Sequence, residues 1–326
     1  MNQRKDIYCE KSFWSELSQK LSEIKNSPDF EERRNNQDLD EWYDLLGRSN
    51  VFFDCSEEVI VELSKKDCYL EGLLIRSGEN RCSVDFLSGA VTSMCKGSSQ
   101  MNTKMYNSLY LSKESHVAQA RNVGIINIGS NDLHSNRHLF NDFGPSVGRD
   151  TERDWAQMLD SAKANQNCNS MIIVDKYIFK DVNANLYRIL NTLLPKKLGT
   201  MFYLSIFSLD GCEESEIERF KQRLDEKIRI IRPELSFFLE VYGCCIDDFH
   251  DRGIITNYLW IEIGAGFNLI KKGLASKTTN IHVIYPMIVS EERIKCSSEG
   301  YWNIIEDAKR YLRIRGMWSN NRLLRE

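Results

Sequence analysis

Short apolar runs alternate along the first half of the chain with segments in which apolar residues recur every three or four positions. The short runs predict strands at 6–10, 50–55, 108–112 and 124–129. The periodic segments predict helices around 13–24 and over 39–46, 56–66 and 115–123. The stretch 77–105 is rich in Gly and Ser and is interpreted as a region containing a surface loop.

The second half repeats this alternation with longer helices. Apolar runs predict strands at 171–175, 200–208, 236–241, 259–263 and 280–284, and periodic segments predict helices at 150–164, 183–193, 213–231 and 301–313. Strands that alternate with helices of ten or more residues favour an α/β domain with a largely parallel sheet. Gly144, Pro145 and Gly148 indicate a boundary, so we expect two α/β domains, 1–145 and 146–326.

Composition narrows the class of protein. With 42% apolar and 28% charged residues and only 5 Pro, the chain is expected to fold, which excludes disordered and collagen-like classes. The net charge of −4 argues against a uniformly basic nucleic-acid coat but permits a local basic groove. No apolar run reaches 18 residues, so we expect no transmembrane segment and a cytoplasmic location. The 10 cysteines contain no C-x-x-C pair and are interpreted as reduced structural thiols.

The residues that most clearly indicate a chemical function lie in the segment FHDRGIITNYLWIEIGAGFN, residues 249–268. His250 and Arg252 are two positions apart, and such residues point to the same side of an extended segment. A guanidinium binds a phosphate oxyanion with paired hydrogen bonds, and a neighbouring imidazole can attack phosphorus or move a proton. The spacing therefore predicts a site for a phosphodiester.

This segment resembles the signature of the phospholipase D superfamily. His250, Arg252 and Asn257 stand at its His, Lys and Asp positions, and Gly264-Ala265 stands at its Gly-Ser position. The resemblance is to single-motif domains of some bacterial proteins and to the non-catalytic C-terminal domain of microtubule-interacting and trafficking proteins. It implies a mixed sheet flanked by helices and chemistry without a cofactor. The residues it assigns are His250, Arg252 and Asn257 for catalysis, and Arg252, Gly264, Gly266 and Asn268 for phosphate binding.

Two departures from the signature affect that assignment. Asn257 lacks the carboxylate that in the family helps to hold and polarise a histidine, and Ala265 lacks the hydroxyl. Active members also use two copies of the motif, whereas this chain has one. Catalysis would therefore require a homodimer that brings two copies of His250 together.

The N-terminal half carries a second pattern, in which acids follow or flank the predicted strands. Glu10, Glu62 and Asp132 occur in an order that resembles PIN-type ribonuclease domains, in which acids at strand ends bind Mg²⁺. The resemblance implies a three-layer domain, although the first acid is Glu rather than the usual Asp. Acids placed there for solubility are the alternative interpretation.

Three functional hypotheses follow. The first is a protein that binds or cleaves phosphodiesters at His250 and Arg252, with nucleic acid as the favoured ligand and a bacterial defence or mobile-element setting by analogy. The second is a non-catalytic module for a protein partner or an anionic lipid. The third is a Mg²⁺-dependent PIN-like nuclease with a C-terminal sensor or dimerisation domain. Two cationic stretches, 221–232 and 309–325, indicate either a phosphate-backbone clamp or a solvated helix face, and the second of them contains Tyr311 and Trp318.

Overall fold

The chain divides into two compact units in the computed structural model, Met1–Phe140 (unit 1) and Asn141–Glu326 (unit 2). The sequence-based boundary was expected five residues later, after 145. The structure describes residues 5–29, 37–96, 101, 103–140, 143–144, 146–152, 154–176, 178, 185–209, 213–264, 266–271, 274–286, 288 and 299–325.

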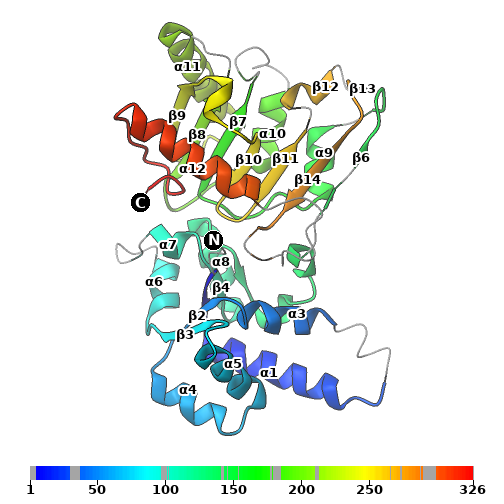
Figure 1. Cartoon of the computed structure of the whole chain (residues 1–326), viewed down its shortest axis with the longest axis vertical. Coiled ribbons are helices and arrows are strands. Elements are labelled where there is room, and N and C mark those ends of the chain that lie inside the picture. The colour runs from blue at the N-terminus through cyan, green and yellow to red at the C-terminus, as the bar shows by residue number, and fades with distance from the viewer. Residues whose placement is uncertain are drawn as a thin grey trace. The chain divides into compact units, whose positions relative to one another are not determined.

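Unit 1 is built on a sheet with the order β3-β2-β1-β4-β5, in which every neighbouring pair is parallel. Figure 1 labels β2, β3 and β4 of this sheet. The strands are β1 (Asp6–Cys9), β2 (Asn50–Phe53), β3 (Ser83–Phe86), β4 (Leu109–Leu111) and β5 (Asn127–Ile128). The strand order reverses between β1 and β4. In open α/β sheets, ligands bind outside the carboxyl ends of the strands at such a reversal.

Helices cover both faces of this sheet. They are α1 (Lys11–Asn26), α3 (Gln37–Leu46), α4 (Glu57–Ser64), α5 (Cys68–Gly78), α6 (Ala90–Lys96), α7 (Thr103–Tyr106) and α8 (Val117–Val123), with 3₁₀ turns at Glu114–His116, Ser130–Asp132 and Arg137–Phe140. On one face Tyr8 packs in a buried cluster with residues of α6, α7 and α8. On the other face Trp14 of α1 lies edge-on to Phe53, with the ring centroids 5.8 Å apart.

The stretch 77–105, which was expected to contain a surface loop, also carries β3 and α6. Helix α5 is capped at its N-terminus by Asp67, whose carboxylate accepts hydrogen bonds from the Tyr69 and Leu70 amides at 3.0 Å each. This N-cap satisfies two of the amides that a helix leaves open at its start.

Unit 2 contains a mixed sheet with the order β6-β14-β11-β10-β7-β8-β9. Only β7, β8 and β9 are parallel neighbours, while β10, β11 and β14 pair antiparallel. The expectation of a largely parallel sheet is therefore correct for one side of the sheet only. The strands are β6 (Ser146–Val147), β7 (Ser170–Asp175), β8 (Phe202–Ser208), β9 (Phe237–Gly243), β10 (Gly253–Thr256), β11 (Trp260–Ile263) and β14 (Thr279–Ile284), with a separate pair β12 (Ile270–Lys271) and β13 (Leu274–Ala275).

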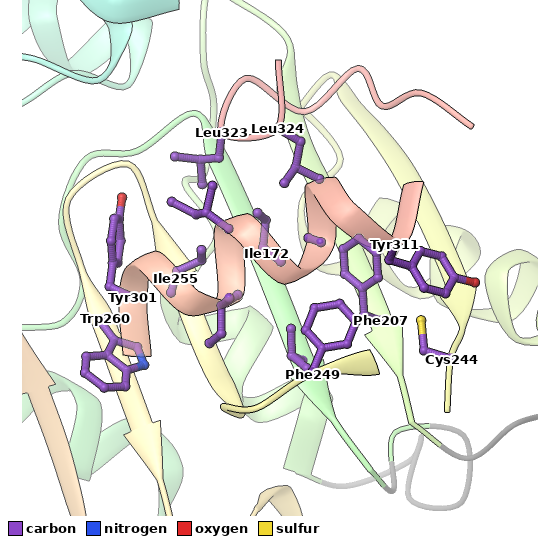
Figure 2. Packing of buried hydrophobic residues seen from close by; sticks show 14 of the residues in the cluster. Ile172, Phe207, Cys244, Phe249, Ile255, Trp260, Tyr301, Tyr311, Leu323 and Leu324 are labelled. Carbon is purple, nitrogen blue, oxygen red and sulfur yellow. The ribbon is translucent and has the colours of Figure 1, made fainter. Parts of the chain in front are cut away.

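The helices of unit 2 are α9 (Trp155–Ser161), α10 (Asn185–Leu193), α11 (Glu214–Ile231) and α12 (Glu299–Ile314), with 3₁₀ turns at Ile246–Asp248 and Phe267–Leu269. Helix α12 lies across one sheet face and packs on Ile172, Phe207 and Ile255, while the C-terminal Leu323 and Leu324 close the same cluster (Figure 2). Among the described residues, no helix combines the length and apolar character required to cross a bilayer.

Candidate functional site

The segment before β10 is held against α12 by an aromatic anchor. Phe249 is 5% exposed, and its ring centroid lies 5.1 Å from that of Phe207 and 6.5 Å from that of Tyr311. Figure 2 shows Phe249 beside Phe207, under the helix that carries Tyr311. Burial of this ring fixes the chain immediately before His250, so the imidazole emerges at a defined point beside α12.

His250 and Asp307 form a hydrogen-bonded pair at that point. Oδ2 of Asp307 lies 3.0 Å from Nδ1 of His250 and accepts the His250 backbone amide at 2.9 Å. The Asp307 side chain is 7% exposed, whereas that of His250 is 70% exposed. Because a carboxylate only accepts hydrogen bonds, Nδ1 is the donor of this bond, and Nε2 carries the lone pair when the imidazole is neutral.

Two arginines of α12 and the following turn brace this pair. Arg310 lies 2.9 Å from Oδ1 of Asp307 and donates to the Asp248 carbonyl at 3.1 Å. Arg315 lies 3.6 Å from the Asp248 carboxylate and stacks over the Tyr311 ring at 3.8 Å. The buried carboxylate of Asp307 is therefore compensated by a cation, as a buried charge requires.

Arg252 lies two residues after His250 in the chain, and its side chain is exposed. Among the described residues it has no hydrogen-bond or ion-pair partner. Residues 250–252 precede β10 rather than forming part of a strand, so the two-residue alternation used to place His250 and Arg252 on one side does not apply to them. The structure leaves both side chains open to solvent.

The glycine-rich turn lies at the same end of the sheet as this segment. Gly253 pairs with Val174 near the end of β7 and with Glu262 near the end of β11, after which Gly264 and Gly266 follow. Gly266 has a φ of 69°, and a Cβ there would come within 2.6 Å of the buried Asp175 carboxylate. The turn therefore requires glycine at this position. Asn268 lies in the 3₁₀ turn that follows, and Ala265 is outside the described residues.

Asn257 lies at the opposite end of β10 and does not share the site. It is fully buried, and its Oδ1 accepts the Asn169 and Ser170 amides at 3.0 and 2.9 Å. Its Nδ2 donates to Oδ1 of Asn169 at 3.1 Å. These bonds tie the β10–β11 turn to the start of β7, so the role of Asn257 in the structure is to hold that turn.

Asp307 is the site residue that the motif did not identify. It belongs to a helix whose buried residues include Ile304, Ala308 and Tyr311. An acid on the buried face of an amphipathic helix is a signal in the sequence, because such a charge needs a partner. That partner, His250, is 57 residues away in the chain.

The three acids expected to bind metal in unit 1 are not brought together. Glu10 follows β1, and its Oε2 accepts the Lys113 amide at 2.9 Å and lies 3.5 Å from Nδ1 of His116. Glu62 is exposed on α4 and pairs with Lys65, while Asp132 lies in a 3₁₀ turn after β5. Within the part of the chain that the structure describes, no three His, Cys, Asp or Glu side chains are grouped as a metal site requires.

Other acids lie at the carboxyl edge of the unit 1 sheet and hold its loops. Asp54, after β2, accepts the Gly89 and Val91 amides, and Glu114, after β4, accepts the Asn131 amide at 3.0 Å. Sequence reasoning did not single out either residue. Like Glu10, they stabilise the turns that follow parallel strands, which accounts for acids at these positions without a metal.

Comparison of the sequence with models of known protein families and with curated proteins found no match. The function proposed for the site therefore rests on its geometry.

Cys244 lies in the buried cluster that contains Phe249. It is 1% exposed, and burial raises the pKa of its thiol to about 12. A thiol with such a pKa is protonated at neutral pH, so Cys244 is a poor nucleophile.

Proposed function

We propose that unit 2 binds and cleaves phosphodiesters, with nucleic acid as the ligand, through His250, Asp307 and Arg252. The observation that carries this proposal is the bond between the buried Asp307 carboxylate and Nδ1 of an exposed His250. A carboxylate that fixes one imidazole nitrogen orients the other toward substrate and stabilises the positive charge that forms during reaction. In this site Asp307 supplies the carboxylate that Asn257 lacks.

The reaction that fits these groups needs no metal. The Nε2 lone pair of His250 forms a bond to phosphorus while the ester P–O bond breaks, and its electron pair leaves with the departing oxygen. That oxygen takes a proton from the protonated His250 of a second copy, which then removes a proton from the water that hydrolyses the phosphohistidine. Arg252 neutralises charge on the phosphoryl oxygens.

The proposal is tested with labelled single-stranded and duplex RNA and DNA in EDTA. We expect turnover that is lost in His250→Ala and falls about 10²-fold or more in Asp307→Asn, because the imidazole then loses its orienting charge. Arg252→Ala should weaken binding, and Arg219→Ala, at an exposed arginine of α11, provides the control. Turnover that survives His250→Ala overturns the proposal.

Absence of turnover in EDTA, together with binding that depends on Arg252, would favour the non-catalytic alternative. The ligand would then be sought among anionic lipids and protein partners.

The order of the unit 1 sheet supports a second candidate, a PIN-like nuclease. The reversal of strand order lies between β1 and β4, and Glu10 stands at the carboxyl end of β1. Because the described acids do not fit a metal site, we derive no mechanism for it. Activity that requires Mg²⁺ and is lost in Glu10→Gln would select this candidate.

A further inference from the structure

The end of α12 presents apolar side chains to solvent. Ile314 is 73% exposed, Met317 is 48% exposed and Trp318 is 76% exposed. A cluster of large apolar side chains exposed at the surface is typical of an interaction site, because apolar side chains are otherwise buried in the core. By contrast, Tyr311 of the same cationic stretch is buried in the core, so the two aromatic residues have different roles.

The backbone that carries Trp318 is fixed on both sides. Before it, the Met317 amide donates to the Leu312 carbonyl at 2.9 Å and the Gly316 amide to the Arg313 carbonyl at 3.1 Å. With Gly316 at a φ of 64°, these bonds form the Schellman motif that ends a helix. After it, the Asn320 amide donates to the Glu240 carboxylate of β9 at 2.8 Å. The exposed indole is therefore held on an ordered turn.

The segment that carries the indole is rich in cations. Residues 308–325 contain six cationic side chains and no acid, in a chain whose net charge is −4. The cations are Lys309, Arg310, Arg313, Arg315, Arg322 and Arg325. Arg310 and Arg315 pair with Asp307 and Asp248, and Arg322 and Arg325 lie over the Tyr203 ring, whereas Arg313 is exposed next to Ile314. An exposed arginine near an exposed indole suits an anionic ligand.

This surface is continuous with the candidate site. Arg310 contacts both Asp307 and the Asp248 carbonyl, and Arg315 contacts the Asp248 carboxylate, two residues before His250. From Asp307 to Ile314 the helix rises by about 10 Å, at about 1.5 Å per residue. A bound strand would thus pass from the imidazole along the cations of α12 to the indole.

We propose that the end of α12, with Arg313 and Trp318, binds single-stranded nucleic acid that extends from the His250 site. The proposal rests on the proposed function and names its substrate class. A rigidly mounted, exposed indole stacks on an unpaired base, while neighbouring arginines contact phosphates. A duplex keeps its bases stacked inside and offers no such face, so the surface selects the single strand.

The test titrates a 12-residue oligothymidylate, and a duplex of equal length, into the full chain while tryptophan fluorescence is recorded. We expect the single strand to quench fluorescence and to bind more tightly than the duplex. Trp318→Ala should remove that quenching and weaken binding about tenfold, and Trp318→Phe should retain most of the affinity. Ile230→Ala, at a residue that is 77% exposed on α11, is the matched control.

Salt dependence tests the contribution of the cations. Arg313→Gln should lower the slope of log affinity against log salt by about 0.7, the value for one phosphate contact of a single strand. Arg219→Gln on α11 should leave that slope unchanged. Equal slopes for wild type and Arg313→Gln would show that Arg313 contacts no phosphate and would overturn its part in the proposal.

The two proposals fail separately. If binding and quenching persist in His250→Ala and no substrate is cleaved by wild type, the strand-binding surface stands and the catalytic proposal fails. If a small diester such as bis(p-nitrophenyl) phosphate is hydrolysed but Trp318→Ala leaves oligonucleotide affinity unchanged, the surface proposal fails alone. Binding to phosphatidylserine vesicles that is lost in Trp318→Ala, with no oligonucleotide binding, would overturn it in favour of a membrane surface.

Discussion

Replacement of Lys5 by Met tests how unit 1 tolerates a buried cation. Lys5 precedes β1, is 6% exposed, and donates its Nζ hydrogen bond to the Asn107 carbonyl. Burial lowers the pKa of Lys5 from 10.5 to about 7, and Asp6 opposes only part of this effect. The fall in pKa corresponds to about 5 kcal/mol, at about 1.4 kcal/mol for each factor of ten in the protonation equilibrium.

The direction of the pH dependence follows from where each state holds the proton. Between pH 7 and 10.5 the unfolded chain keeps the proton on Lys5, whereas the native protein has released it. The free energy of unfolding therefore rises with pH in this window, and the stabilisation is lost as pH falls to 7. From pH 7 to 8.5 the gain is about 2 kcal/mol, since the native group has lost its proton over most of this range while the unfolded chain keeps it.

Lys5→Met removes this titration, so its stability relative to wild type should be highest at or below pH 7 and fall by about 2 kcal/mol by pH 8.5. Hydrogen exchange of β1 peptides in a urea series, read by mass spectrometry at each pH, reports on unit 1 alone. Lys65→Met, on the same unit, supplies the background. A difference between Lys5→Met and wild type that does not change with pH would refute the reasoning.

Two further substitutions test the geometry around the helices and the site. Gly253→Ala should destabilise unit 2 by about 2 kcal/mol or more, because a Cβ there would come within 2.3 Å of the Ile261 carbonyl oxygen. Urea denaturation of unit 2 measures this loss of stability, and an unfolding midpoint equal to that of wild type would contradict the expected clash. Asp67→Ala should cost about 2 kcal/mol, because it removes the cap of α5 and the acceptor of the Trp14 indole at 2.8 Å. Thermal unfolding tests the second change, with Asp67→Asn expected to retain most of the stability.

The sequence was most informative where apolar runs are short and bounded. The runs at 6–10, 50–55 and 171–175 coincide with β1, β2 and β7, because a buried strand needs only local composition to be recognised. The antiparallel pairing of β10 and β11 could also have been predicted from the sequence. Only Asn257–Leu259 connect them, and a parallel crossover needs a dozen or more residues, so the pair must be antiparallel.

Contacts between segments that are distant in the sequence could not be predicted from local sequence patterns. Nothing local to residue 250 indicates that its imidazole meets an acid near the end of the chain, since that contact depends on how α12 packs on the sheet. The same applies to Glu10, whose carboxylate is satisfied by an amide after β4. Motif spacing identifies which residue types are present, but the three-dimensional packing determines which of them meet.

Asn257→Asp makes this difference measurable, because it would restore the acid of the phospholipase D signature. The Nδ2 group of Asn257 donates to Oδ1 of Asn169, and a carboxylate oxygen would instead face that acceptor in a fully buried position. The two backbone amides that bond Oδ1 would still be satisfied. We therefore expect a loss of about 2 kcal/mol in stability, measured by urea denaturation of unit 2, and no gain in diester hydrolysis. A gain in hydrolysis would mean that position 257 acts on the chemistry and that Asp307 does not take the role of the acid in the signature.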